Sequence, residues 1–468
     1  WYSDWGQVMS VLDPQRNHFY IGSENLLCRL EPKAQGPDVD SDLEQSVIDE
    51  IRVRVGTLLK TETVSLLLGA GASINCGGQL IGSVPIAVER AVLAEGIVGE
   101  GRPRIRRWLP LFYLAIRQCA REGAIPLTRD EILERRAALR GESPPAFPAN
   151  FEQVLALLHR WRSALPKSGG RLRVDGSPPL DTKAEDLDTI IQQATRALAR
   201  TCDLPATGKE GGLGTFKTLV RKLLTRPLNL KRANVFTLNY DTLIEQAADA
   251  EGVVLLDGFV GTQRRVFRPE SYEQDLYFPA DTTEGRVHRF DRVLHLYKLH
   301  GSITWRATEP SIDNPYGLLS APFDSHNREP LLIYPTPAKY GEVLGLPYSE
   351  LFRRFAAALC RPQSVLFVIG YGFGDDHVNA IIRQALAIPS FTLVVVDPSP
   401  TSTFVKTLRE QEDRRVWIAE GPSIGTLAGF VEHVLPDLRD EEIRRKVLAT
   451  YRALSKNRAG DGDKGDGS

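Results

Sequence analysis

The chain has few cysteines, no long apolar run and almost no net charge. Its five cysteines are scattered along the chain, and no two of them form a C-x-x-C pair: Cys28, Cys76, Cys119, Cys202 and Cys360. This spacing argues against a structural zinc module and a disulfide framework, and it favours a reducing, cytoplasmic setting. No apolar stretch approaches the ~20 residues that span a bilayer, so we expect no membrane association.

The formal net charge of −1 gives the whole chain no electrostatic attraction for nucleic acid or anionic lipid. Residues 101–140 hold ten arginines against four acids. No interleaved aromatic residues mark a stacking platform there, so direct nucleic-acid binding is disfavoured. With 42% hydrophobic and 25% charged residues, the 468-residue chain has the composition of a soluble globular protein, and we favour one large α/β domain with an insertion.

Apolar runs typical of buried strands alternate with helical patterns, which predicts a Rossmann-like α/β fold with a doubly wound parallel sheet. The expected strands are Val64–Leu68, Asn234–Leu238, Val253–Leu256, Val293–Lys298, Leu331–Tyr334, Ser364–Ile369 and Phe391–Val396. The expected parts are an irregular N-terminal arm and linker over 1–45, a core over 46–98 and 233–435, an all-helical insertion over 99–232, and a C-terminal helix with a flexible tail over 436–468.

A glycine-rich segment, Gly69-Ala70-Gly71-Ala72-Ser73, follows the first of these strands. Backbone N–H groups at such a strand exit can bind a pyrophosphate, and glycine lets the ligand approach closely. A third glycine of the dinucleotide fingerprint would fall at Ile74, and no Lys-Ser/Thr pair completes a phosphate loop. The segment therefore predicts a nucleotide site of neither the dehydrogenase nor the P-loop kind.

Two further strand ends carry chemically useful side chains. Asn239 lies where open α/β folds place their ligands, although Asn239 or Asp241 could instead cap the following helix, and for Asp241 the cap is favoured. His300 can act as a general base near neutral pH. We expect Asn239 and His300 to face one cleft with Gly71, their side chains within about 10 Å of each other.

A second glycine-rich exit, Gly370-Tyr371-Gly372, follows the strand that ends at Ile369. Its glycines indicate close backbone approach to a ligand or special dihedral angles. Asp397 ends the next strand, where an acid often holds an adenosine ribose. A turn made by its side chain before Pro398 explains Asp397 equally well.

The ordered strings GAGAS, TLNYD, KLHGS and VIGYGFGDD resemble the sirtuin-like (silent information regulator) family, and more closely its bacterial branch of NAD-consuming antiphage effectors. The resemblance covers about residues 46–435, and Asn150-Phe-Glu152 is similar to that branch's Asn-x-Glu element. Protein-deacylating members carry a four-cysteine zinc module. This chain has no cysteine pairs to build one, which puts deacylation in doubt.

The resemblance implies NAD as the substrate and no bound metal. It implies that Asn239 positions the nicotinamide ribose or the attacking water, and that His300 deprotonates a ribose hydroxyl or that water. The residues it implies for NAD binding are Gly69, Ala70, Gly71, Ala72, Ser73, Asp241, Gly301, Gly370, Tyr371, Gly372 and Asp397.

The expected activity is hydrolysis of NAD to nicotinamide and ADP-ribose by an effector of abortive infection. The resemblance also implies a homo-oligomer controlled by a separate partner, such as a HerA-type ATPase or an Argonaute-like sensor. Two alternatives remain open. One is a protein deacylase or ADP-ribosyltransferase, and the other is a catalytically silent subunit that binds NAD or ADP-ribose as sensor or scaffold.

Overall fold

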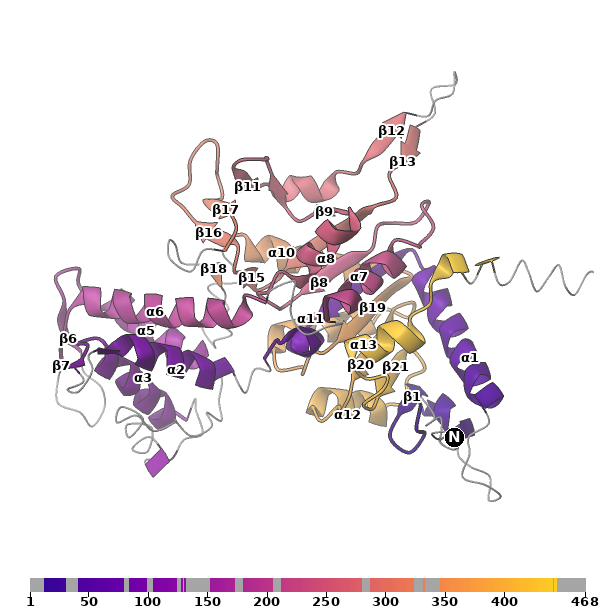
Figure 1. Ribbon diagram of the computed structural model, residues 1–468, viewed down its shortest axis with the longest axis horizontal. Helices are drawn as coiled ribbons and strands as arrows, with labels where there is room; N and C mark the ends of the chain where they lie inside the picture. The colour runs from indigo at the N-terminus through magenta and orange to yellow at the C-terminus, as the bar shows by residue number, and fades with distance from the viewer. Residues whose placement is uncertain are drawn as a thin grey trace, which may run out of the picture.

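A nine-stranded sheet forms the centre of the molecule, in the strand order β2-β1-β21-β20-β19-β3-β8-β14-β9 (Figure 1). The computed structural model describes residues 12–30, 41–79, 84–98, 104–123, 128, 130–131, 152–172, 180–204, 212–279, 287–323, 331–332, 346–440 and 442–443. From β21 to β9 all neighbouring strands are parallel. The bounds are β1 His18–Ile21, β2 Glu24–Asn25, β3 Thr63–Leu68, β8 Asn234–Thr237, β9 Val254–Leu256, β14 Val293–Lys298, β19 Ser364–Ile369, β20 Thr392–Asp397 and β21 Val416–Glu420.

Helices cover both faces of this sheet, as the apolar strands require. Every residue of β3 and of β19 is buried, so neither face of the sheet's centre can contact water. One face packs on α1 Ser41–Leu59, α7 Gly212–Leu223 and α8 Leu243–Glu251. The other packs on α10 Tyr348–Leu359, α11 Asp376–Leu386 and α12 Thr403–Glu410. The predicted doubly wound, Rossmann-like α/β fold is confirmed.

A separate helical block lies to one side of the sheet (Figure 1). It has its own apolar core, built by α2 Val84–Gly96, α3 Leu109–Arg121, α5 Glu152–Ala164 and α6 Ala184–Cys202. The block therefore begins at α2 rather than at residue 99, and α7 packs on the sheet instead of on the block. The expectation of an all-helical insertion is wrong, because two short hairpins also lie here: β4 Ile97–Val98 with β5 Arg104–Ile105, and β6 Gly170–Leu172 with β7 Leu180–Thr182.

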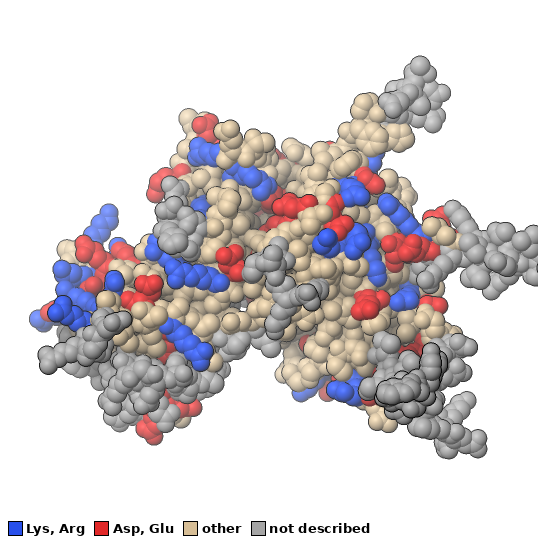
Figure 2. Space-filling model, in the orientation of Figure 1, with Lys and Arg blue, Asp and Glu red and all other residues tan. Residues whose placement is uncertain are grey.

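Charges of both signs are mixed on the surface of the helical block. On the face shown in Figure 2, basic side chains lie beside acidic ones. Arg162 lies 2.6 Å from Asp188, and Arg107 lies 3.3 Å from Asp186. These two arginines are thus paired with acids, as is common on a solvated helical surface.

The N-terminal arm was expected to be irregular, and this expectation is wrong for residues 18–30. Strand β1 pairs antiparallel with β21 at the edge of the main sheet, and Phe19 is fully buried. A 3-10 turn, Leu26–Leu30, then packs its leucines on the same core as α1. With four residues, β1 is too short to show a clear alternation of apolar and polar residues. Strand β21 is not among the strands that the sequence predicts. Each strand gains its hydrogen-bond partner only in the fold.

A smaller group of strands lies to one side of the main sheet (Figure 1). It contains the four-stranded sheet β10-β11-β17-β16 and the hairpin β12-β13, which protrudes in Figure 1. The bounds are β10 Phe259–Val260, β11 Arg265–Phe267, β12 Tyr277–Pro279, β13 Val287–Arg289, β16 Trp305–Ala307 and β17 Leu318–Ser320, with the 3-10 turn Pro269–Glu273 between β11 and β12. The expected strand Leu331–Tyr334 is described only as β18 Leu331–Leu332, and it pairs with β15 Gly301–Ser302 outside the main sheet.

The chain leaves the sheet through a short α-helical turn, α13 Leu427–Gly429, and a π-helical turn, Phe430–Val434. Most of the expected C-terminal helix and tail, 436–468, lies outside the described residues. Among the residues that are described, no helix combines the length and the apolar character needed to cross a membrane.

Candidate active site at the carboxyl edge of the sheet

Four neighbouring parallel strands bring the predicted site segments to one edge of the sheet. Leu68 at the end of β3 pairs with Ile369 of β19 on one side and with Thr237 of β8 on the other. Thr237 in turn pairs with Lys298 of β14. The segments that follow these paired residues therefore leave the sheet side by side, as expected for ligand-binding loops of an open α/β fold.

Asn239 connects the end of β8 to the first glycine-rich segment. Its side-chain amide nitrogen donates hydrogen bonds to Gly69 O at 2.9 Å and to Ser73 Oγ at 3.0 Å. The Ser73 hydroxyl donates to Asp241 Oδ2 at 2.6 Å. This chain of hydrogen bonds fixes the orientation of the Asn239 amide, since its nitrogen must face Gly69 and Ser73.

Asp241 contacts both the first glycine-rich segment and the start of α8. One carboxylate oxygen accepts from Ser73, and the other accepts from the backbone N–H of Leu243 at 3.1 Å, in the first turn of α8. Asp241 thus makes a side-chain turn just before α8, whose N-cap residue is Thr242, together with a direct link to the glycine-rich segment. Its placement does not test contact with NAD.

The glycines of the first segment are required by protein packing. A Cβ at Gly69 would lie 2.5 Å from Gly370 O, and one at Gly71 would lie 2.8 Å from Gly370 Cα. Gly370 itself has φ of +65°. The exits of β3 and β19 thus pack backbone to backbone, which no larger residue permits.

The same packing uses N–H groups that the sequence assigned to a pyrophosphate. Gly71 N donates to Gly370 O at 2.9 Å, Ala72 N donates to Gly69 O at 3.0 Å, and Gly69 N donates to Ile369 O at 3.0 Å. These three donors are committed within the protein. The first segment therefore offers fewer free N–H groups to a phosphate than its glycines predict, because Ile369 O and Gly370 O accept two of them.

The second glycine-rich exit differs from the first. Gly372 and Gly374 are exposed, and a Cβ at either would meet no atom within 4 Å. The intervening Phe373 is buried, which holds the segment on the core. Open space beside two exposed glycines leaves this segment able to approach a ligand closely.

Tyr371 turns inward between these positions. Its hydroxyl accepts from Asp375 N at 2.9 Å and lies 3.1 Å from Asp375 O. Burial raises the pKa of Tyr371 well above its ordinary value. Its hydroxyl therefore supports the loop, and the predicted contact with NAD stays a prediction.

His300 is buried at the end of β14, and its Nε2 lies 3.2 Å from Asp375 Oδ2. The ring also packs near the ring of Phe352 on α10, with centroids 6.4 Å apart. Asp375 was not predicted as a site residue, although the Asp-Asp pair after the glycines was visible in the sequence. His300 thus contacts the second glycine-rich segment through Asp375, and Asn239 contacts the first through Gly69 and Ser73. Direct cooperation between Asn239 and His300 stays a prediction.

Lys298 is a further buried group that sequence reasoning missed. It is 3% exposed, and its ammonium donates to Asp241 O and, at 2.9 Å, to Glu245 Oε1. Burial raises the pKa of Glu245, and the Lys298 charge opposes that shift. The signal available in the sequence was a lysine at the end of a largely apolar strand, two residues before His300.

Two predicted residues are explained by local structure. Gly301 is buried with φ of +88°, a left-handed conformation that favours glycine. Asp397 accepts from Ser399 N at 2.8 Å, so the side-chain turn is present. Burial raises the pKa of Asp397. It lies on the carboxyl edge two strands from β3, and its ribose role is untested.

Asn150-Phe-Glu152 lies outside the described residues apart from the backbone of Glu152, which begins α5. Within the described ranges, no group of three or more His, Cys, Asp or Glu side chains is arranged to hold a metal ion. The five cysteines are free thiols.

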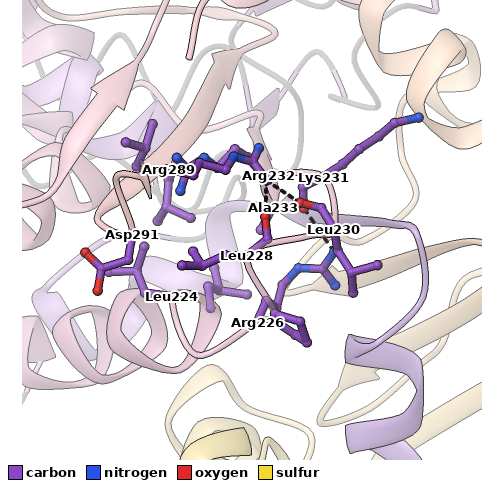
Figure 3. A pocket seen from close by; sticks show the side chains of 13 residues that line it. Leu224, Arg226, Leu228, Leu230, Lys231, Arg232, Ala233, Arg289 and Asp291 are labelled. Carbon is purple, nitrogen blue, oxygen red and sulfur yellow. Dashed lines mark hydrogen bonds between the residues drawn. The ribbon is translucent and has the colours of Figure 1, made fainter. Parts of the chain in front are cut away.

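A cavity lies at the opposite, amino edge of the sheet (Figure 3). Its lining includes the residues just before β8 and those that begin β14. Arg226 donates to the carbonyls of Leu59, Thr61 and Lys231, the last two at 3.2 and 3.1 Å. Burial lowers the pKa of Arg226 to about 10. The cations of this cavity thus hold chain segments together, far from the predicted site.

Comparison with protein-family models gives one match: residues 233–420 match the model described as SIR2-like domain. The match supports the sirtuin-like resemblance and is compatible with NAD-related activity. It covers Asn239, His300 and the second glycine-rich exit. The first exit precedes it in sequence and joins it through the Gly69 and Gly370 contacts. Comparison with curated proteins gives no match.

Proposed function

We propose that this protein is an NAD glycohydrolase, which cleaves the bond between nicotinamide and ribose to give nicotinamide and ADP-ribose. The observation that carries the proposal is the meeting of Asn239, Ser73 and Gly69 beside the His300 and Gly370 segments on adjacent strand ends. The SIR2-like match over residues 233–420, which include Asn239, His300 and Gly370, supports NAD as the substrate class.

The chemistry needs little from the protein beyond binding and orientation. Nicotinamide carries the positive charge in NAD and leaves as a neutral molecule, so the leaving group needs no proton. The ribose develops oxocarbenium character, water adds to it, and one proton is released. Asn239, fixed through its amide nitrogen, positions the ribose or the water, and His300 accepts the proton.

Turnover with purified protein tests the proposal. Nicotinamide and ADP-ribose would be measured beside the variants Asn239→Ala and His300→Ala, and each should lose on the order of 10²-fold or more in rate. Matched controls are Asn234→Ala, at the other end of β8, and His288→Ala, exposed on β13; both should keep the parent rate. Normal turnover in the two site variants would refute the site assignment.

The biological role is a further part of the proposal. We propose that the protein depletes NAD as an effector of abortive infection in the cytoplasm, as a homo-oligomer with a separate sensor or ATPase partner. Light scattering tests the oligomer, and co-purification with the neighbouring open reading frame's product tests the partner. NAD levels in phage-challenged cells test the role. An absence of turnover with partner and trigger present would contradict hydrolysis, and turnover only with an acetylated peptide would indicate deacylation.

A further inference from the structure

The Asp375 carboxylate contacts two backbone N–H groups of α11 and the ring of His300. It is 9% exposed, and Oδ1 accepts from His377 N at 3.0 Å and from Val378 N at 3.4 Å, which caps α11. Its second oxygen, Oδ2, lies 3.2 Å from His300 Nε2. A helix cap uses only one carboxylate oxygen, so the cap alone does not explain the contact with His300.

The backbone around this carboxylate is also fixed. Asp375 N donates to the Tyr371 hydroxyl at 2.9 Å, and Asn379 Nδ2 donates to Phe373 O at 2.8 Å. Both Tyr371 and Asn379 are buried. The loop therefore presents the carboxylate to His300 in one orientation, and that orientation follows from contacts within the chain.

We propose that Asp375 is a positioning residue that holds the His300 ring in the tautomer protonated at Nε2. This inference rests on the proposed NAD hydrolysis, in which His300 accepts a proton. An ionised carboxylate can only accept a hydrogen bond, so a neutral His300 must place its proton on Nε2 and its lone pair on Nδ1. The same carboxylate stabilises the imidazolium that forms when His300 takes up a proton.

The decisive variant is Asp375→Asn. Asparagine caps a helix about as well as aspartate, but its amide nitrogen can donate to Nε2 and so removes the preference for one tautomer. Asp375→Ser supplies a second capping side chain that is too short to replace the contact. The matched control is Asp376→Asn, at the adjacent exposed acid in the first turn of α11.

Three readouts separate positioning from a structural role: thermal unfolding, kcat and KM for NAD, and the ¹⁵N signals of His300. The signals would be assigned with His300→Ala in ¹⁵N-histidine-labelled protein. We expect Asp375→Asn and Asp375→Ser to remain folded and to lose about 100-fold or more in kcat, with KM changed far less. The parent should show Nε2 protonated and Nδ1 unprotonated, and Asp375→Asn should lose that pattern.

Parent-level kcat in a folded Asp375→Asn variant, or an unchanged tautomer pattern, would overturn the inference. A loss of the same size in Asp376→Asn would also overturn it, because the effect would then belong to the helix terminus. If the parent shows no NAD turnover, the proposed hydrolysis is refuted, independently of the inference about Asp375. The ¹⁵N signals then still decide whether Asp375 sets the tautomer.

Discussion

The two edges of the nine-stranded sheet both bury polar side chains, but they arrange them differently. At the amino edge, Arg226 donates to backbone carbonyls, and Arg289 donates to Leu228 O at 2.7 Å and Leu230 O at 2.5 Å. At the carboxyl edge, Asn239 and Asp241 both bind the Ser73 hydroxyl, and Gly372 in the loop after β19 is exposed. Cations that donate to carbonyls hold chain segments together, whereas an oriented amide at the edge where open α/β sheets bind ligands can act on a ligand.

The largest expected effect is at the carboxyl edge, for Lys298→Met. Loss of the ammonium leaves the Glu245 carboxylate without its partner, so we expect a loss of about 4 kcal/mol in the free energy of unfolding, measured in urea. The double variant Lys298→Met with Glu245→Leu is the control and should recover much of this loss. Full stability in the single variant would show that the pair does not support the site.

At the amino edge, His295 makes stability depend on pH. Burial lowers the pKa of His295 to about 4 from 6.5, and, among the described residues, neither ring nitrogen has a hydrogen-bond partner. Between pH 6.5 and 4 the unfolded chain binds the extra proton, so stability falls as the pH falls through this window and is complete above it.

The His295 contribution is about 3 kcal/mol from the linkage relation. Unfolding measured from pH 7.5 to 4 should show this loss in the parent, and His295→Leu should flatten that part of the curve. Parallel curves for parent and variant would show that His295 is not buried in the neutral form.

Two glycines at the carboxyl edge separate packing from ligand access. A Cβ at Gly69 would meet Gly370 O at 2.5 Å, so Gly69→Ala should lose about 2 kcal/mol of stability. Gly372→Ala is the matched comparison. Its added Cβ would meet no atom within 4 Å, so the free energy of unfolding should equal that of the parent. A rise in KM for NAD in Gly372→Ala would support a ligand beside the second exit. Equal destabilisation of both variants would contradict the difference drawn between the two exits.

The smallest effect is expected for Arg226→Lys. Lysine keeps the charge but cannot reach Leu59 O, Thr61 O and Lys231 O with one planar group, so we expect a loss of about 1.5 kcal/mol and unchanged NAD turnover. Urea unfolding and the nicotinamide assay measure the two quantities. A drop in turnover without a drop in stability would link the two edges and break the comparison.

Local pattern was enough to predict several elements. Predominantly apolar runs predicted β14 and β19 at their observed bounds, and helical periodicity predicted α10 and α11. Local pattern did not predict β1, whose partner β21 is about 400 residues away in the chain. It also did not predict where the helical block begins. Packing against α6 and α3 assigns α2 to that block. Such assignments depend on long-range contacts, which no local period contains.

The sequence by itself determined that strand exits carrying glycines, Asn239 and His300 would meet at one edge, because parallel strands share their carboxyl ends. Only the tertiary structure decided what each group contacts. It committed the Gly69, Gly71 and Ala72 amides to the protein, and it gave His300 the Asp375 carboxylate. The physical reason is that hydrogen bonding depends on distance and direction between atoms of different loops, and residue order fixes neither.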